Sequence, residues 1–330
     1  MNKEHPEVKF GKTGVLIVNL GTPDSTSWWD VRKYLKEFLS DKRVIEVNPL
    51  IWQLILNFII LTFRPSKSAH AYKKIWLKEK NESPLLHYTR NQAEKLKLKV
   101  GNENVIVDFA MRYGNPSIKS KLNNLKNSGC ENIIILPLYP QYAAATTATV
   151  CDEVYRTLMK MRWQPSLQIV PHYESEPMYI NALIKSIERK IKGINWKPDL
   201  IIASYHGIPK KYFDKGDPYH CYCHKTTRLI KEKFSLVEIQ TTFQSRFGPQ
   251  EWLTPYTDKT LEALPVKGIK NLLIICPGFA SDCVETLEEI DIQGRESFLK
   301  NGGEKFGLIP CLNDSKEHIE LLEKLVRKYL

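Results

Sequence analysis

The sequence predicts an α/β protein of two similar halves, each a parallel sheet with helices on both of its faces. Short β-branched runs alternate with amphipathic helical stretches along the whole chain, which is typical of parallel sheets joined by crossover helices. The same alternation begins again in the second half of the sequence. A length of 330 residues also exceeds what one hydrophobic core commonly holds, so roughly two domains are expected.

Three strand-like runs mark the first half, at residues 15–20, 105–109 and 133–138. Trp163-Gln164-Pro165 closes a helical stretch, and a new strand-like run follows it. We therefore predict a first half over residues 10–165.

The second half repeats the pattern with strand-like runs at residues 167–170, 200–203, 237–240 and 272–276. We assign residues 166–312 to this half. Residues 313–330 form a last segment, in which leucine or isoleucine at 319, 321, 322, 325 and 330 predicts a helix that packs back on the body. No low-complexity linker separates the halves, so we expect them to pack tightly around a cleft.

Composition narrows the class of protein. Hydrophobic residues make up 42% and charged residues 26%, which excludes a disordered chain and a membrane bundle. A net charge of +11 favours anionic partners, but the lysines are scattered and no basic stripe alternates with aromatic residues, so we expect no nucleic acid. Seven cysteines, and a start (residues 1–7) without the apolar core of a secretory signal, predict reduced thiols in the cytoplasm.

One strongly apolar segment covers residues 50–63. It is shorter than the ~20 residues that a spanning helix needs. Two interpretations stay open: a buried helix, or an apolar lip that touches a membrane surface with Trp52, Phe58 and Phe63 and ends in Arg64.

A histidine follows the most apolar strand of the second half. Residues 200–203 read as a buried strand, and His206 comes where that strand stops. Ligands of parallel α/β sheets bind outside the carboxyl ends of the strands, and histidine exchanges protons near neutral pH. His206 is therefore a candidate general base; the alternative is a structural histidine that donates to a backbone carbonyl.

Acidic residues follow the next strand along. With Ser281 as the helix N-cap, Asp282, Glu285 and Glu289 fall on one helical face. They are either a solvated row that favours the helix dipole, or a row that faces the His206 cleft and collects protons and a borderline cation.

The loop at residues 242–255 follows a further strand and combines polar donors with Arg246 and Trp252. It is either an ordinary Gly/Pro loop or the wall of a pocket for a flat, partly anionic ligand.

Several long motifs occur in a specific order. SYHGIP at 204–209, FQSRFGPQEWLTP at 243–255 and PGFASDCVETLEEI at 277–290 lie in the second half; VNLGTPDS at 18–25, Ser83-Pro84-Leu85, Arg112-Tyr113 and LPLYPQYAAATTAT at 136–149 lie in the first. Over essentially the whole chain the sequence resembles the ferrochelatase family. The resemblance implies two Rossmann-like (chelatase-type) halves around a porphyrin cleft. It also implies a lyase of haem biosynthesis that inserts ferrous iron into protoporphyrin IX to form protohaem and releases two protons.

The resemblance also implies roles for individual residues. His206 corresponds to the acceptor of the pyrrole protons and Glu285 to its acidic partner, both also near the metal, and Asp282 and Glu289 correspond to a continuing track for protons or metal. The candidates for porphyrin binding, as ring walls or propionate partners, are Leu20, Arg64, Ser83, Arg112, Tyr113, Ser245, Arg246 and Trp252. Iron entry from the His206 side or from the Leu20 and Tyr113 side stays open.

Two departures from the family pattern concern cysteine. Cys283 stands where some relatives have histidine, which weakens any mechanism that needs imidazole there. Alanines 143–145 replace one cysteine of the animal-type 2Fe–2S cluster, and the chain stops after its last helix, so we expect no such cluster and no other required cofactor. Ferrous iron is then a substrate. The separate run His220-Cys221-Tyr222-Cys223-His224 reads either as a metal site or as two free thiols on a surface loop.

The expected partners are protoporphyrin IX, ferrous iron and, peripherally, the inner face of a membrane; we expect a monomer. Coproporphyrin as the substrate, cobalt insertion into another tetrapyrrole, and a non-catalytic tetrapyrrole carrier are the alternatives. A carrier would need neither His206 nor the acidic row.

Overall fold

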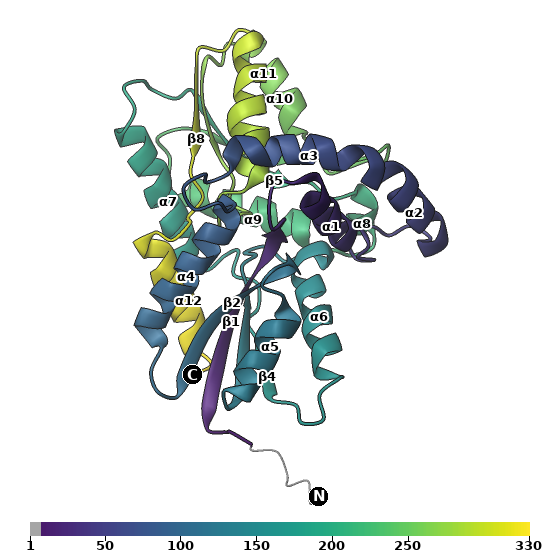
Figure 1. Cartoon of the computed structure of the whole chain (residues 1–330). Coiled ribbons are helices and arrows are strands. Elements are labelled where there is room, and N and C mark those ends of the chain that lie inside the picture. The colour runs from purple at the N-terminus through teal and green to yellow at the C-terminus, as the bar shows by residue number, and fades with distance from the viewer. Residues whose placement is uncertain (1–7) are drawn as a thin grey trace, which may run out of the picture.

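The computed structural model describes residues 8–330 and contains two four-stranded parallel sheets, one above the other in Figure 1. The predicted lack of a secretory signal rests on residues 1–7 and lies outside the described residues. Both sheets carry helices on their faces, which confirms the predicted fold class.

The first half holds the sheet with strand order β2-β1-β3-β4. Its elements are β1 (Lys12–Thr22), α1 (Trp28–Leu39), α2 (Pro49–Ile55), η1 (Leu56–Ile60), α3 (Leu61–Ile75), α4 (Pro84–Val100), β2 (Val105–Gly114), α5 (Ile118–Asn127), β3 (Cys130–Pro137), η2 (Ala144–Ala148), α6 (Thr149–Leu158) and β4 (Ser166–Ile169). In the centre, Ile17 of β1 pairs with Phe109 on one side and Leu136 on the other.

The second half holds the sheet with strand order β6-β5-β7-β8. Its elements are α7 (Pro177–Lys192), β5 (Leu200–His206), α8 (Lys210–Asp214), α9 (Tyr219–Lys233), β6 (Ile239–Gln244), α10 (Thr257–Ala263), η3 (Pro265–Lys267), β7 (Asn271–Ile275), η4 (Glu285–Gly294), α11 (Arg295–Lys300), β8 (Lys305–Ile309) and α12 (Lys316–Arg327). The strand order repeats that of the first half element by element.

Strand β4 corrects the predicted domain boundary. We expected residues 167–170 to open the second half, but Ile133 pairs with Leu167, so β4 closes the first sheet. The turn at Pro165 joins α6 to β4 inside one half. Local turn chemistry marks where an element ends but carries no information about which sheet the next strand joins, so the halves meet after β4 and before α7.

Strand β8 is an element that the sequence pattern did not reveal. Its centre is Gly307, a residue type that is depleted in strands. A Cβ atom at residue 307 would lie 2.7 Å from Leu273 Cδ2 of the neighbouring strand, so close packing requires glycine there.

The two halves share one interior. A single buried cluster contains Val15 and Ile17 of the first sheet together with Tyr205 and Phe243 of the second. Helix α12 contacts α4 and α7, one from each half, as Figure 1 shows for the yellow helix beside α4. Tight packing of the halves and a last helix folded back on the body are therefore both observed.

The apolar segment 50–63 is not a buried helix. It lies in α2, the π-helical turn η1 and the start of α3, which follow one another without a break (Figure 1), with Leu50, Phe58 and Phe63 exposed by 80%, 72% and 72%. Length and composition of residues 49–75 would suffice to cross a membrane. However, Leu56 and Leu61 are fully buried in a cluster with residues of α1, so the segment is an amphipathic lip packed on the first half.

Candidate active site

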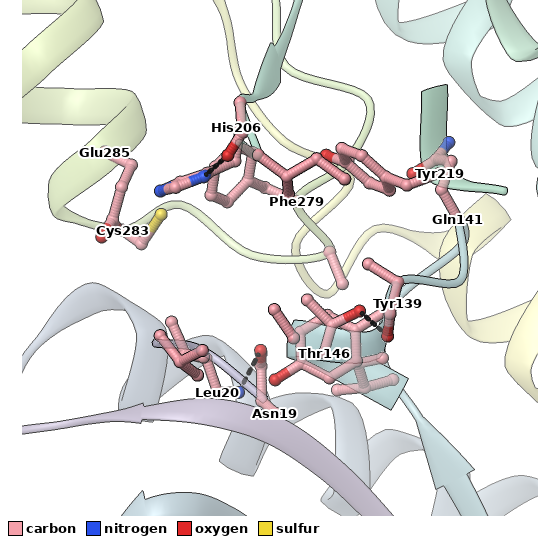
Figure 2. A pocket seen from close by; sticks show the side chains of 18 of the residues that line it. Asn19, Leu20, Tyr139, Gln141, Thr146, His206, Tyr219, Phe279, Cys283 and Glu285 are labelled. Atoms are coloured by element: carbon pink, nitrogen blue, oxygen red, sulfur yellow. Dashed lines mark hydrogen bonds between the residues drawn. The ribbon is translucent and has the colours of Figure 1, made fainter. Parts of the chain in front are cut away.

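A cleft of about 960 Å³ opens between the two halves. Its lining comes from the carboxyl ends of the inner strands of both sheets: Asn19 and Leu20 near the end of β1, Tyr139 after β3, His206 at the end of β5, and Phe279 after β7. Figure 2 shows the two walls facing each other across the cavity. The strand-end rule thus located the cleft correctly.

His206 is the last residue of β5 and is only half-buried. Its Nδ1 lies 2.7 Å from the carbonyl oxygen of Gly207. A carbonyl only accepts, so Nδ1 carries the proton, and in the neutral ring Nε2 is left with a free lone pair. Figure 2 shows this second nitrogen turned toward the side of Glu285 and Cys283. The two interpretations of His206 are therefore compatible: one nitrogen is anchored structurally, and the other is available as a base.

The acidic helix differs from the predicted one at its start. Residue 284 is its first helical residue and residues 285–294 are π-helical, so Ser281 is not the N-cap. The Oγ atom of Ser281 instead accepts a hydrogen bond of 3.0 Å from Gln92 of α4. This buried contact between the halves holds Ser281 outside the helix.

Asp282 does not line the cleft. Its carboxylate accepts hydrogen bonds from Asn313 Nδ2 at 2.7 Å, from the Cys311 amide at 3.2 Å and from Thr286 Oγ1 at 3.1 Å. It ties the start of the π-helix to the segment after β8. Glu285 does line the cleft, so the three predicted acids do not form one row on a single face.

Glu289 lies behind Glu285, in a second cavity of about 1070 Å³ that also contains Ser245, Arg246 and Trp252. The Ser245 amide donates to it at 2.7 Å. Burial raises the pKa of Glu289, while hydrogen bonds from Ser245 and the nearby His206 lower it.

Gln244 is a site residue that sequence reasoning missed. Its Nε2 donates to the backbone oxygen of Glu285 at 2.9 Å and to Glu289 Oε2 at 3.4 Å, and its Oε1 accepts from Ser204 Oγ at 2.7 Å. Gln244 pairs directly with His206 in the sheet. Its position at the end of its strand, equivalent to that of His206, was the available signal.

The predicted ring walls are only partly at the cleft. Leu20 lines it on the wall opposite His206, and Trp252 lines both cavities, with its Nε1 donating to Phe247 O at 3.0 Å. The LPLYPQYAAATTAT motif at 136–149 also reaches the cleft, through Tyr139 and Thr146, which we had not singled out.

Besides Ser245, the polar candidates Ser83 and Arg246 line cavities next to the cleft, whereas Arg64 lines none of these cavities. The Arg64 guanidinium stacks 4.4 Å from the centre of the Phe247 ring, and burial lowers the pKa of Arg64 while Glu285 opposes that shift. Ser83 caps α4 and lines a small cavity of about 230 Å³ next to Glu285. Arg246 faces the second cavity and pairs with Asp258 at 2.5 Å.

Arg112 and Tyr113 are not brought to the cleft. The Arg112 guanidinium forms an ion pair with Asp41 and donates to Thr149 O at 2.8 Å. Tyr113 is fully buried and donates to Asp41 at 2.9 Å. A motif marks a strand end but does not say which of its side chains point to the ligand.

The donors at the cleft are few. Among residues 8–330, no group of three or more His, Cys, Asp or Glu side chains is arranged to hold a metal ion. His206 and Glu285 are thus two donors at an open site, which suits a metal in passage better than a structural metal. Burial and the neighbouring Glu285 raise the pKa of Cys283, so its thiol stays protonated.

The two halves and the cleft between them form a chelatase-type fold. The structure titled SirB from Bacillus subtilis with Fe3+ matches at a TM-score of 0.58 and 13% identity, over 96% of this chain and 95% of that chain. The structure of CbiX, titled the terminal enzyme for siroheme biosynthesis in denitrifying bacteria, matches at 0.54 and 12%, over 96% and 99%. At these identities the likeness shows the shared fold.

Sequence relatives identify the family. The ferrochelatase family model matches residues 12–330. Ferrochelatase of Allorhizobium ampelinum is 57% identical over 330 residues, which cover 99% of this chain and 96% of that protein. Ferrochelatase of Rhizobium meliloti is 56% identical over 332 residues, covering 100% and 98%. The chain belongs to the ferrochelatase family, and is therefore a metal chelatase, as its motifs had implied.

Proposed function

We propose that this protein inserts ferrous iron into protoporphyrin IX and so forms protohaem, the terminal step of haem biosynthesis. One Fe²⁺ replaces the two N–H protons of the porphyrin, which leave the site. The observation that carries the proposal is His206: one nitrogen is bound to the Gly207 carbonyl, the other is free, and it stands in a cleft of a chain 57% identical to a named ferrochelatase.

In this proposal His206 Nε2 accepts the pyrrole protons. Glu285 stands beside it on the same wall, and Glu289 continues the path outward into the second cavity. Gln244 hydrogen-bonds the backbone of Glu285 and the carboxylate of Glu289, so it holds the two positions together. Because the Asp282 carboxylate is occupied by Asn313, Cys311 and Thr286, we assign Asp282 a positioning role at the start of the track.

The porphyrin ring would lie between the Leu20 wall and the His206 wall. Arg64 and Ser83 near Glu285, and Ser245 and Arg246 in the second cavity, are the proposed polar partners at the ring edge. Iron would approach from the His206 and Glu285 side, because an imidazole and a carboxylate stand there, whereas the opposite wall at Leu20 carries neither.

The test is an anaerobic insertion assay with Fe²⁺ and protoporphyrin IX. Replacing a general base commonly reduces turnover by about 10²–10⁴-fold, and we expect His206→Ala and Glu285→Ala to fall in that range. His70→Ala, at an exposed histidine of α3, is the control and should keep the parental rate.

Unchanged rates of iron insertion in both His206→Ala and Glu285→Ala would contradict the mechanism. Porphyrin binding without insertion by the parent would instead support the carrier alternative. Coproporphyrin is offered in parallel; faster insertion into it than into protoporphyrin would reverse the substrate assignment.

Peripheral membrane contact through the lip is a second part of the proposal. Leu50, Leu54, Phe58 and Phe63 expose a contiguous apolar face that is long enough to enter an interface. Phe58→Ser with Phe63→Ser should reduce sedimentation with anionic vesicles, whereas Leu236→Ser, at a residue with 73% exposure elsewhere, should not. Equal sedimentation of the parent, the double variant and Leu236→Ser would contradict membrane contact through the lip.

We also propose that the protein acts as a monomer without a resident cofactor, and that iron is only its substrate. Sedimentation equilibrium and metal analysis of the protein as purified test these two points. A dimer mass, or iron and sulfide in stoichiometric amounts, would contradict them.

A further inference from the structure

Two histidines outside the cleft share one face of α9. His220 and His224 are four residues apart, so they lie one helical turn from each other, and their ring centroids are 4.4 Å apart. They belong to the cysteine- and histidine-rich run that the iron-insertion site does not use. The run lies within the helix α9 (Tyr219–Lys233), so the predicted surface loop is wrong.

The two rings have a fixed apolar support. Both pack on Phe243 of β6, with centroids at 5.8 Å and 6.0 Å, and Phe213 of α8 meets His220 edge-on at 5.1 Å. Rings that are already held side by side lose little conformational freedom when they bind one ion.

The ring nitrogens are available. His224 is exposed and His220 is half-buried, and within residues 8–330 neither imidazole makes a hydrogen bond to protein. Burial lowers the pKa of both histidines, and for His224 the neighbouring His220 lowers it further. Both rings are therefore neutral at pH 7 and present lone pairs to solvent.

We propose that His220 and His224 bind a first-row divalent transition-metal ion through one nitrogen each, with water in the remaining positions. Two histidines at i and i+4 on one helix face are the geometry that helical zinc motifs use. Imidazole pairs favour Cu²⁺, Ni²⁺ and Zn²⁺ over earlier metals of the row. The site is separate from the cleft, whose lining includes Tyr219 but neither of these histidines.

The cysteines of the run do not complete the site. Cys223 is fully buried, and burial raises its pKa, so it is not a thiolate donor. Cys221 is exposed, but in the described part of the chain no three such donors come together. The ligand set is two nitrogens, which predicts a reversible and solvent-accessible site.

The test uses porphyrin-free, chelator-treated protein and Ni²⁺ or Zn²⁺ alone, with calorimetric titration and thermal unfolding as readouts. The parent should bind one ion at this site, and its Tm should rise by about 5 °C at a metal concentration of ~100 times Kd. His220→Gln or His224→Gln should weaken binding by roughly 100-fold, because two linked ligands gain about 10²–10⁴ over one. His224 is exposed, so its variant keeps the fold even if His220→Gln disturbs the packing on Phe213.

Matched variants identify the ligands. Cys221→Ser should bind as tightly as the parent; loss of binding in it would replace the two-imidazole site with a thiolate site. His206→Gln with Glu285→Gln should keep the calorimetric site, and its disappearance there would assign the metal to the cleft. Both outcomes overturn the proposal, as does equal binding by the parent and His224→Gln. Insertion of iron at the parental rate by His224→Gln would further separate this site from the reaction.

Discussion

The two halves of the molecule have the same strand order but face the cleft with different chemistry. Strand β1 brings Asn19 and Leu20 to the cleft, with Gly21 next in the sequence, and β5 brings His206 to it, with Gly207 next in the sequence. In each half a π-helix follows the third strand: η2 in the first half and η4 in the second. The lining residues from η2 are Ala145 and Thr146, whereas that from η4 is Glu285. Leu20 is thus the topological counterpart of His206.

This difference shows that the two halves share a fold but place a histidine and a carboxylate on only one wall of the cleft. Ionisable groups must be close to one another to exchange protons, so they gather on one wall. An opposite wall without charge keeps water away and requires no buried counter-charge. In the proposed mechanism the second half supplies the base and acids, and the first half supplies the surface against which a flat ligand is held.

The strongest test of the comparison is at the two glycines. Gly21 has a φ of +119°, and a Cβ there would lie 1.8 Å from the Tyr113 backbone oxygen. A Cβ at Gly207 would lie 3.0 Å from the Gln244 backbone oxygen. We expect Gly21→Ala to lower the free energy of unfolding by more than about 4 kcal/mol and Gly207→Ala by about 1–2 kcal/mol. Equal losses in denaturant unfolding would remove this distinction between the halves.

The next largest effect separates the two walls in catalysis. His206→Ala should reduce kcat by about 10²–10⁴-fold, because it removes the base. Leu20→Ala should act mainly on KM, by roughly tenfold, since a leucine contributes ~1.5 kcal/mol when it is buried against a ligand. Steady-state kinetics with protoporphyrin IX checks the split. A kcat loss of similar size in both variants would mean that the first half takes part in the chemistry.

A third prediction concerns how the halves are held together in acid. His318 of α12 is fully buried, and burial lowers its pKa to about 4. The unfolded chain binds this proton more readily than the folded protein does. Stability from the neutral ring is therefore present above about pH 6.5 and is lost as pH falls toward 4, up to about 3 kcal/mol. His318→Gln should flatten this part of the stability profile. A parent and variant with parallel profiles would contradict it.

The smallest effect is expected at Glu289. Its pKa is raised in the folded protein, chiefly by burial. A raised carboxyl pKa gives stability that is present at low pH and is lost as pH rises through the folded value. The parent should therefore gain stability relative to Glu289→Gln as pH falls from 7 toward 5. Thermal unfolding at a series of pH values measures the sign, and a change in the opposite direction would show that the Ser245 hydrogen bonds outweigh burial.

Much of this organisation was readable from the sequence because strands and their ends leave local signals. Residues 200–203 predicted a buried strand, and the polar residue at its end, His206, lies in the cleft. The predictions that failed concern elements whose position depends on residues distant in the sequence. Strand β4 belongs to the first sheet and not, as predicted, to the second. Strand β8 was missed because it contains Gly307, and glycine is required there by close packing against Leu273, a contact that the local sequence does not show.

The prediction for the acidic helix was wrong for a different reason. The single-face row assumed α-helical spacing that begins after Ser281, and a π-helix has a different spacing. Ser281 and Asp282 are held by Gln92 and Asn313, from α4 and from the segment after β8. Such contacts are tertiary, and the periodicity of residues 281–289 does not predict them.

The bond between His206 Nδ1 and the Gly207 carbonyl has a consequence for repeated turnover. Both the neutral ring and the imidazolium donate from Nδ1, so this bond is unchanged when Nε2 gains or releases a proton. In the proposed mechanism the imidazole can therefore accept two protons in succession without rotating about its side-chain torsions. The first proton must leave Nε2 before the second arrives. The rate of the proton-transfer step is then limited by departure of the first proton and not by reorientation of the ring.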